Sequence, residues 1–370
     1  MEIICSKCAK TLDADGVEAF TQCECSECGA LLIVPKKFGD LILQNSLGRK
    51  SCFDIYEGFD LSRNMAETVF VMDNTIPEYD ALLRIAREEA ALLSALKQTN
   101  ISPIINTGEV DGVFFASEPF MDGYSMSSYN SDSHSPLEIE NVIEIMKSAA
   151  MGLATAHHRD IPHHDISPEN IHVDARGNVR IKNYFLSRFI YKQEEKQNTL
   201  NIHSSVSPYF ISPEKTETAV EDKRGDVFSY GALFYFLLTG KYPFNGRNEL
   251  EIIYSRIKKI KVRKDSEDIY SEDASTNLMN PDAVEYAPPH PLGKLRPEIN
   301  EELSAMIMKA LSYYPPSRPT VTHILDFINQ YQAEQDKEKN FVSIQRKMIL
   351  AKTVVALPPK KNGISALFKH

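Results

Sequence analysis

Four cysteines near the start of the chain are spaced for metal binding. They form two CxxC pairs, Cys5 with Cys8 in "CSKC" and Cys25 with Cys28 in "CSEC", and sixteen residues separate the pairs. Two tight turns at this spacing can present four thiolates tetrahedrally to Zn²⁺. A zinc ion held in this way is structural, because four thiolates leave no coordination position open for chemistry.

A fifth cysteine leaves one alternative open. Cys23 lies two residues before Cys25 and could replace it as a ligand, although the CxxC spacing favours Cys25. Gly29 follows the second pair, where a turn that points backbone amides at the sulfur atoms needs a residue tolerant of positive φ. Residues 1–36 therefore resemble a zinc ribbon, which would need the metal to fold because so short a module has little core. A redox pair or a metal-free turn is the alternative interpretation.

The stretch "HHDISPENIHV", which begins at His163, resembles the catalytic loop of a protein kinase. The resemblance implies that His163 is structural, that Asp165 accepts the proton of a substrate hydroxyl and that Asn170 binds a metal ion. His164 stands where the family has an arginine, and Ser167 stands where phosphoryl transfer uses a lysine.

The order of elements around this loop supports the resemblance. From about residue 38 to residue 330, strand patterns are followed by one helix, more strands and then mostly helices. The resemblance is to bacterial serine/threonine kinases of the eukaryotic type. It implies an α+β fold over residues 37–330, with a small β-rich lobe that has one main helix and a larger, mostly helical lobe.

The expected phosphate-binding hairpin lacks the residues that the family uses there. "LGRKSCFDIYEGFD" resembles the glycine-rich loop with its two strands, but only Gly48 is kept, and Lys50 and Phe53 occupy the positions of the other two glycines. In the third strand, "ETVFVMD", Met72 takes the place of the lysine that contacts phosphate. The predicted cleft therefore lacks both the backbone cradle and the cation.

The next two elements complete the small lobe. The amphipathic run "LLRIAREEAALLSALKQTNI" predicts a helix, and its spacing selects Glu89 as the residue that would pair with the strand lysine. With Met72 opposite, that ion pair cannot form. "FFASEPFMDGYSM" resembles the hinge between the lobes, with Ser117 at the gatekeeper position and the backbone from Glu118 to Phe120 available to an adenine edge.

The larger lobe keeps its scaffold residues and loses a metal ligand. The family's "DFG" is replaced by "NYF", so Asn183 stands for the aspartate that binds Mg²⁺. The resemblance implies that Asp226 fastens the backbone of the catalytic loop. It also implies that Glu214, in "SPE", pairs with Arg318.

The missing residues are the ones that would contact ATP or metal. Met72 offers no charge, and Asn183 offers one neutral carbonyl where Mg²⁺ prefers an anionic oxygen. Each loss would remove about 3–4 kcal/mol of transition-state stabilisation. The sequence therefore predicts weak or absent binding of ATP and Mg²⁺ and a catalytically inactive kinase homologue, a pseudokinase, in which Asp165 and Asn170 are vestigial. Such a protein would act as a protein-binding or signalling scaffold.

Two other functions stay open. The first is a weak or atypical ATP-dependent serine/threonine kinase that uses Asp165 as the base, Asn170 and Asn183 around a metal ion, and Lys50 on the phosphates. The second makes the zinc ribbon the recognition module and the kinase-like domain its support.

Composition and charge limit the partners. A net charge of −10 and a pI of about 5.6 argue against general binding of nucleic acid. The longest apolar run is too short to cross a bilayer, so we expect a cytoplasmic protein. Residues 262–288 form a predominantly acidic insertion, and residues 331–370 form a basic tail with a possible amphipathic helix, which could pack on the domain or engage a partner or an acidic membrane.

Overall fold

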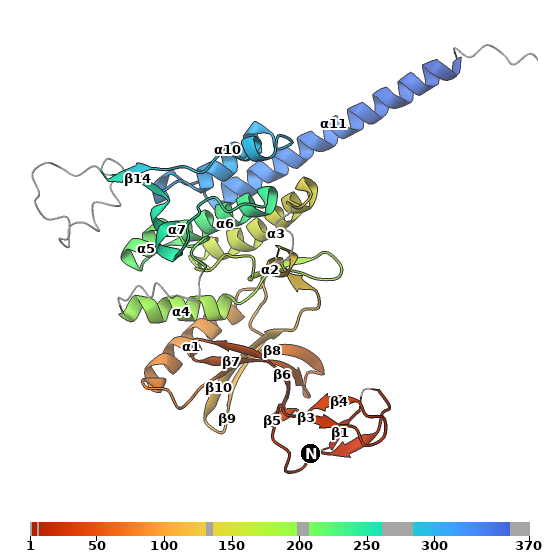
Figure 1. The fold of residues 1–370 in the computed structure, drawn as a ribbon, viewed down its shortest axis with the longest axis vertical. Helices are drawn as coiled ribbons and strands as arrows, with labels where there is room; N and C mark the ends of the chain where they lie inside the picture. Colours follow the sequence, from red (N-terminus) through yellow and green to blue (C-terminus); the bar gives the residue numbers. More distant parts are fainter. Residues whose placement is uncertain (1, 6, 131–135, 198–206, 261–283, 356–370) are drawn as a thin grey trace, which may run out of the picture.

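The computed structural model describes residues 2–5, 7–130, 136–197, 207–260 and 284–355. A small amino-terminal module precedes a six-stranded sheet with one helix, and a mostly helical unit follows (Figure 1). The sheet unit is called the small lobe below, and the helical unit the large lobe. The two-lobed α+β architecture predicted from the sequence is confirmed.

Two short hairpins build the amino-terminal module. Strand β1 (Glu2–Ile4) pairs with β2 (Thr11–Asp13), and β3 (Gln22–Glu24) pairs with β4 (Leu31–Ile33), both antiparallel. The core between the hairpins consists of Ile3, Ala14 and Val34, which agrees with the small size of the module. It cannot supply much stabilisation by burial alone.

The module is joined closely to the small lobe. Only Val34 and Pro35 separate β4 from β5 (Lys36–Phe38), which is already a strand of the six-stranded sheet. The ring of Phe20 stacks on Tyr56 of that sheet, with centroids 5.1 Å apart. The link between the module and the sheet is therefore too short to act as a flexible linker.

The small-lobe sheet is antiparallel in the order β5-β6-β7-β8-β10-β9. Its remaining strands are β6 (Leu41–Lys50), β7 (Phe53–Asp60), β8 (Met65–Met72), β9 (Asn106–Val110) and β10 (Val113–Pro119). Alternate side chains of β8 point to opposite faces, so Phe70 and Met72 join the main core while Val69 joins a second cluster on the outer face.

Helix α1 (Tyr79–Ser94) covers the inner face of this sheet. Its buried residues recur at helical spacing: Leu82, Ile85, Ala86, Glu89, Ala90 and Leu93. All but one of these residues are apolar, so burial of apolar surface stabilises the packing of α1 on the sheet. Glu89 is the exception, and its partner is described with the site below.

The large lobe contains most of the helices. Its elements are β11 (Tyr124–Ser125), α2 (Met126–Asn130), α3 (Ile139–His158), β12 (Ile171–Val173), β13 (Val179–Ile181), α4 (Tyr184–Gln197), α5 (Pro213–Thr218), α6 (Lys223–Thr239), α7 (Glu249–Tyr254), β14 (Ile257–Ile260), β15 (Val284–Tyr286), α9 (Leu292–Leu295), α10 (Glu301–Ala310), the 3₁₀ turn η1 (Pro315–Ser317) and α11 (Val321–Val355).

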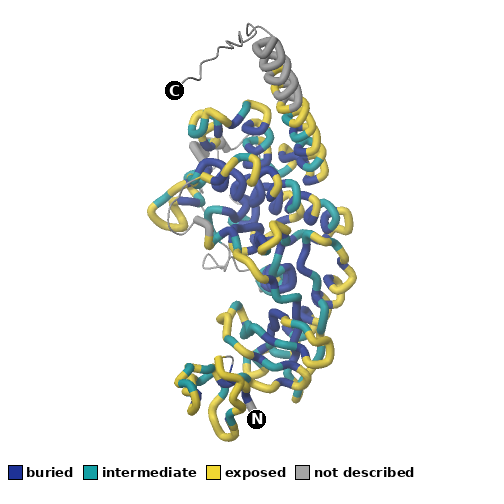
Figure 2. The backbone as a smooth tube through the Cα atoms, turned by 90° about the vertical axis from the view of Figure 1, so that its right-hand side faces the viewer, coloured by how far each residue is buried: buried dark blue, intermediate teal, exposed yellow. Residues whose placement is uncertain are grey.

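Helix α6 is the central element of this lobe. It is buried along almost its whole length, as expected for a helix that is apolar on all sides. Asp222 caps its amino terminus by accepting a hydrogen bond from the Arg224 amide, and Gly240 ends it with φ of 69°. Figure 2 shows buried backbone running from this region into the small lobe, and one apolar cluster includes residues of both lobes.

A helix is present in the predicted tail, as the sequence suggested, and the predicted insertion includes a strand. Helix α11 continues through the predicted boundary at residue 330 and extends past the body of the protein (Figure 1). Near its end, the insertion predicted at 262–288 contains strand β15, which pairs with β14. Residues 261–283 and 356–370 lie outside the described part of the chain. No helix among the described residues is both long and apolar enough to span a membrane.

Candidate active site and candidate metal centre

The four CxxC cysteines converge in the amino-terminal module. The Sγ atoms of Cys5, Cys8, Cys25 and Cys28 all lie within 4.8 Å of one another, and the pairs Cys5–Cys28 and Cys8–Cys25 are 3.6 Å apart. A zinc ion bonded to sulfur at about 2.3 Å in a tetrahedron would hold the sulfurs roughly 3.8 Å apart. The cluster therefore has the size and the donor set of a four-thiolate zinc site.

Cys23 lies outside this cluster. It is on β3 and packs against the small core of the module. The structure thus brings Cys25 to the candidate site, as its CxxC spacing favoured.

Backbone amides face the first cysteine of each pair. The amides of Cys8 and Lys7 lower the pKa of the Cys5 thiol to about 6, and those of Cys28 and Glu27 lower the pKa of Cys25. Gly29 has φ of 68°, as the predicted turn requires. These amides favour the thiolate, which is the form that binds a metal.

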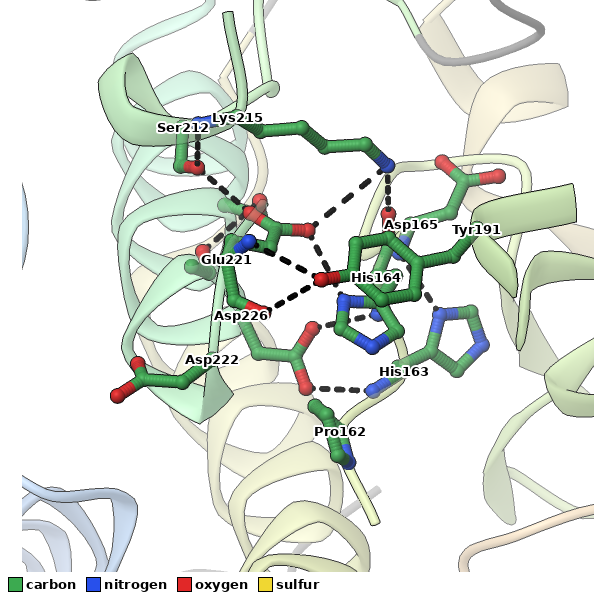
Figure 3. A network of polar contacts seen from close by, with 12 residues as sticks. Pro162, His163, His164, Asp165, Tyr191, Ser212, Lys215, Glu221, Asp222 and Asp226 are labelled. Carbon is green, nitrogen blue, oxygen red and sulfur yellow. Dashed lines mark hydrogen bonds and ion pairs between the residues drawn. The ribbon is translucent and has the colours of Figure 1, made fainter. Parts of the chain in front are cut away.

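Asp226 holds the catalytic loop, as predicted. Its carboxylate accepts hydrogen bonds of 2.7 Å from the backbone N–H groups of His163 and His164 (Figure 3). It also lies 2.7 Å from Nε2 of His157. Burial by itself would raise the pKa of Asp226, but the hydrogen bond and charge of His157 lower it well below its ordinary value. The second predicted scaffold contact is also confirmed, since Arg318 donates to both oxygens of Glu214 at 2.6 and 2.8 Å.

A buried polar network replaces the arginine that the family has at position 164. The His164 ring stacks on Tyr191 with centroids 3.5 Å apart, and its Nδ1 lies 3.1 Å from Glu221 (Figure 3). Lys215 donates to the His164 carbonyl at 3.0 Å, and Ser212 donates to Glu221 at 2.6 Å. Burial lowers the pKa of His164 to about 3 and raises that of Glu221 to about 7. This network ties the catalytic loop to the segment that follows "SPE".

The two carboxamides at the expected metal positions bind each other. Asn183 donates from Nδ2 to Oδ1 of Asn170 at 2.9 Å, and Asn170 donates to the backbone carbonyl of Asp165 at 2.7 Å. Asn183 has φ of 58°, a conformation that asparagine tolerates better than most residues. The pair offers Mg²⁺ only neutral oxygens, one of them already used, and therefore does not fit a magnesium site of the kinase type.

The carboxylate of Asp165 is paired with a residue of the small lobe. Nζ of Lys50, at the tip of the β6–β7 hairpin, lies 3.1 Å from Oδ2 of Asp165. Asp165 is 4% exposed, so this contact lies inside the cleft. Gly48, the glycine kept from the family's glycine-rich loop, has φ of 112°.

Aromatic side chains occupy the space beneath the hairpin. Phe53 is fully buried, and its ring lies 5.3 Å from that of Phe185 and 5.0 Å from that of Phe189. Phe70 contacts Phe185 from β8, and Met72 is fully buried in the same cluster. The position that holds the lysine in the family is thus part of an apolar core. A phosphate could bind there only if this core were opened to solvent.

Glu89 finds a partner that the sequence did not predict. Arg188 of α4 donates from Nε at 2.5 Å and from Nη2 at 3.2 Å to its carboxylate, and from Nη1 at 2.8 Å to the Pro162 carbonyl. Helix α4 lies between α1 and the helices of the large lobe (Figure 1). The run "YFLSRFI" carries the signal that could have indicated this helix, because Phe185, Arg188 and Phe189 recur at spacings of three and four.

The hinge prediction was wrong by one residue. Strand β10 presents Phe114 and Ala116 to the main core and Phe115 to the outer face, so Ser117 also faces outward, where it donates to Glu67 at 2.6 Å. Glu118 therefore takes the inward position assigned to Ser117.

Two consequences follow for the adenine edge of the cleft. The carboxylate of Glu118 is 3.8 Å from Nζ of Lys182, and burial raises its pKa. The backbone N–H of Phe120 donates to the Ala66 carbonyl at 3.1 Å, so it is not available to an adenine.

These lobes, this hinge and this loop define the protein kinase fold, and sequence comparison agrees. The family model described as the protein kinase domain matches residues 61–327. The chain therefore belongs to the protein kinase family.

Individual relatives are distant. Serine/threonine-protein kinase PrkC of Bacillus subtilis is 24% identical over 230 residues, which cover 62% of this chain and 35% of that protein. PknL of Mycobacterium tuberculosis is 25% identical over 216 residues, covering 58% of this chain and 53% of PknL. Tyrosine-protein kinase MasK of Myxococcus xanthus is 23% identical over 314 residues, which cover 80% of this chain and 44% of MasK. The chain thus spans about a third to a half of these relatives.

Solved structures show the same fold. The kinase domain of Mycobacterium tuberculosis PknI superposes with a TM-score of 0.54 at 18% identity, covering 80% of this chain and 97% of that one. At this level of identity the likeness establishes the fold alone.

Proposed function

We propose that this chain is a catalytically inactive member of the protein kinase family, a pseudokinase, that works in the cytoplasm by binding other proteins. A structural zinc ion on Cys5, Cys8, Cys25 and Cys28 would hold its amino-terminal module as a zinc ribbon. The scaffold contacts of the family are kept, and the contacts to phosphate and metal are replaced by contacts within the chain.

The observation that carries this proposal is the state of the phosphate and metal positions. Met72 is fully buried among apolar side chains, and Asn183 is hydrogen-bonded to Asn170. Transfer of a phosphoryl group depends on positive charge placed against the developing charge of the transition state. Neither position supplies that charge, and neither offers an anionic oxygen that would hold a cation.

A second candidate, weak kinase activity, is favoured by one contact. The ammonium of Lys50 lies 3.1 Å from Asp165, so a cation is present near the expected base. If Lys50 turned toward a triphosphate, it could replace part of the missing charge. Asn183 would still bind Mg²⁺ poorly in that arrangement.

A thermal-shift titration distinguishes these functions. Binding of a ligand to the folded state raises the melting temperature as the ligand concentration exceeds Kd. The pseudokinase proposal predicts that millimolar ATP with Mg²⁺ shifts the melting temperature no more than ATP with EDTA does. A shift that requires Mg²⁺ would support the kinase and contradict the proposal. ADP and tripolyphosphate serve as matched controls for the base and the phosphates.

A further inference from the structure

Polar contacts join the two lobes across the cleft. From the small lobe, Lys50 pairs with Asp165, Ser51 donates to Gln193 of α4 at 2.9 Å, and Glu89 pairs with Arg188 of α4. Each contact joins the β6–β7 hairpin tip or α1 to one residue of the large lobe.

These contacts are shielded from water to different degrees. The side chains of Glu89 and Arg188 are 8% and 7% exposed, and those of Asp165 and Lys50 are 5% and 19% exposed. Charges in such places are screened less by solvent and salt than surface charges are. The aromatic contacts of Phe53 with Phe185 and Phe189 lie beside them and bury the apolar surface of the same hairpin.

We propose that the Lys50–Asp165, Ser51–Gln193 and Glu89–Arg188 contacts form an interlobe clasp. The clasp holds the hairpin tip and α4 together without any ligand, and it keeps Lys50 unavailable to anions until the hairpin lifts. The chain thereby contains a contact that closes this part of its own cleft to anions. This inference goes beyond the proposed function, because it holds whether or not the protein transfers phosphate.

A bound anion would compete with Asp165 for Lys50. Lys50 is the cation of the hairpin that points into the cleft, whereas the neighbouring Arg49 pairs with Asp54 and Asp73 inside the small lobe. An entering polyphosphate would have to take Lys50 from Asp165 and would then face the carboxylate left behind. The loss of the Lys50–Asp165 pair and the repulsion between the anion and Asp165 both oppose binding. The closed hairpin and a bound anion therefore exclude each other.

Hydrogen–deuterium exchange on the full chain tests the clasp. In Asp165→Asn, which keeps the shape of the side chain, and in Lys50→Ala, amides of residues 47–53 and 184–193 should exchange about tenfold faster than in the wild type. The double variant should be no faster than either single variant, because both remove the same contact. Arg49→Ala is the matched control and should leave residues 184–193 protected. Unchanged exchange in Asp165→Asn would overturn the proposal.

Titration with inorganic tripolyphosphate tests the exclusion of anions. Asp165→Asn should bind it at least about tenfold more tightly than the wild type, because Lys50 is released. The Lys50→Ala, Asp165→Asn double variant should lose that gain. Equal affinity of the double variant and Asp165→Asn would show that Lys50 is not the released cation and would contradict the proposal. The absence of kinase activity, by contrast, would leave both results unaffected.

Discussion

Arg188 should be one of the most sensitive positions of the fold. It makes a two-point contact with Glu89 and a third hydrogen bond to Pro162, and both charged side chains are less than a tenth exposed. Replacing Arg188 by methionine keeps the apolar stem and leaves the Glu89 carboxylate buried without its cation. Breaking a buried ion pair in this way costs about 3–5 kcal/mol of the free energy of unfolding.

The measurement is urea denaturation followed by circular dichroism, since the chain has no tryptophan. We expect Arg188→Met to lower the free energy of unfolding by about 3–5 kcal/mol. The Glu89→Met, Arg188→Met double variant should recover most of the loss, because two apolar side chains of similar length can replace a buried pair. Arg49→Ala, which removes two partly exposed ion pairs, with Asp54 and Asp73, should have little effect. A double variant as unstable as Arg188→Met would refute this reasoning.

Two further predictions concern the metal centre and the buried network. The purified chain should contain one zinc ion by elemental analysis; Cys5→Ser with Cys8→Ser should lose it, whereas Cys23→Ser should keep it. Burial raises the pKa of Glu221 to about 7, above its ordinary 4.5, so the folded state keeps a proton that the unfolded state has lost. Between those two pH values this group lowers stability as pH rises, by at most about 1.4 kcal/mol per pH unit. Relative to wild type, Glu221→Gln should therefore gain stability as pH rises from about 4.5 to 7, and a constant difference in unfolding free energy across that range would show that Glu221 does not titrate as described.

The residues predictable from the sequence were those whose partners are fixed by the fold. Asp226 sits in the first turn of α6, the buried central helix of the large lobe, and Glu214 and Arg318 join segments that contact this helix. Each of these residues has a charged side chain within a family motif, and the motifs lie far apart along the chain. The cysteines were predictable for a different reason, since the geometry of a CxxC turn is local.

The register of the hinge could not be fixed in the same way. In a strand, a shift of one residue moves every side chain to the other face, and "FASEP" offers a polar residue at both Ser117 and Glu118. The packing of Phe114 and Ala116 in the main core and of Phe115 in the outer cluster shows that Glu118 faces inward. Carboxylates are rarely buried without a cation, and the sequence alone does not show that Lys182 lies beside Glu118.

Helix α4 depends on contacts distant in the sequence. Its register brings Arg188 to Glu89, which lies 99 residues earlier, and Phe185 and Phe189 to Phe53. Because Met72 leaves Glu89 without the strand lysine, the carboxylate needs another cation once it is buried. The absence of the lysine was visible in the sequence, but the identity of the replacement was not.

The most direct test of the central claim is transfer of labelled phosphate from γ-labelled ATP, with Mg²⁺ or Mn²⁺, to the protein itself and to a generic protein substrate. Wild type and Asp165→Ala are compared at equal concentration and purity. We predict that the two proteins give the same background incorporation, because Met72 and Asn183 leave triphosphate and metal without their charged partners. Incorporation by the wild type that disappears in Asp165→Ala would contradict the account.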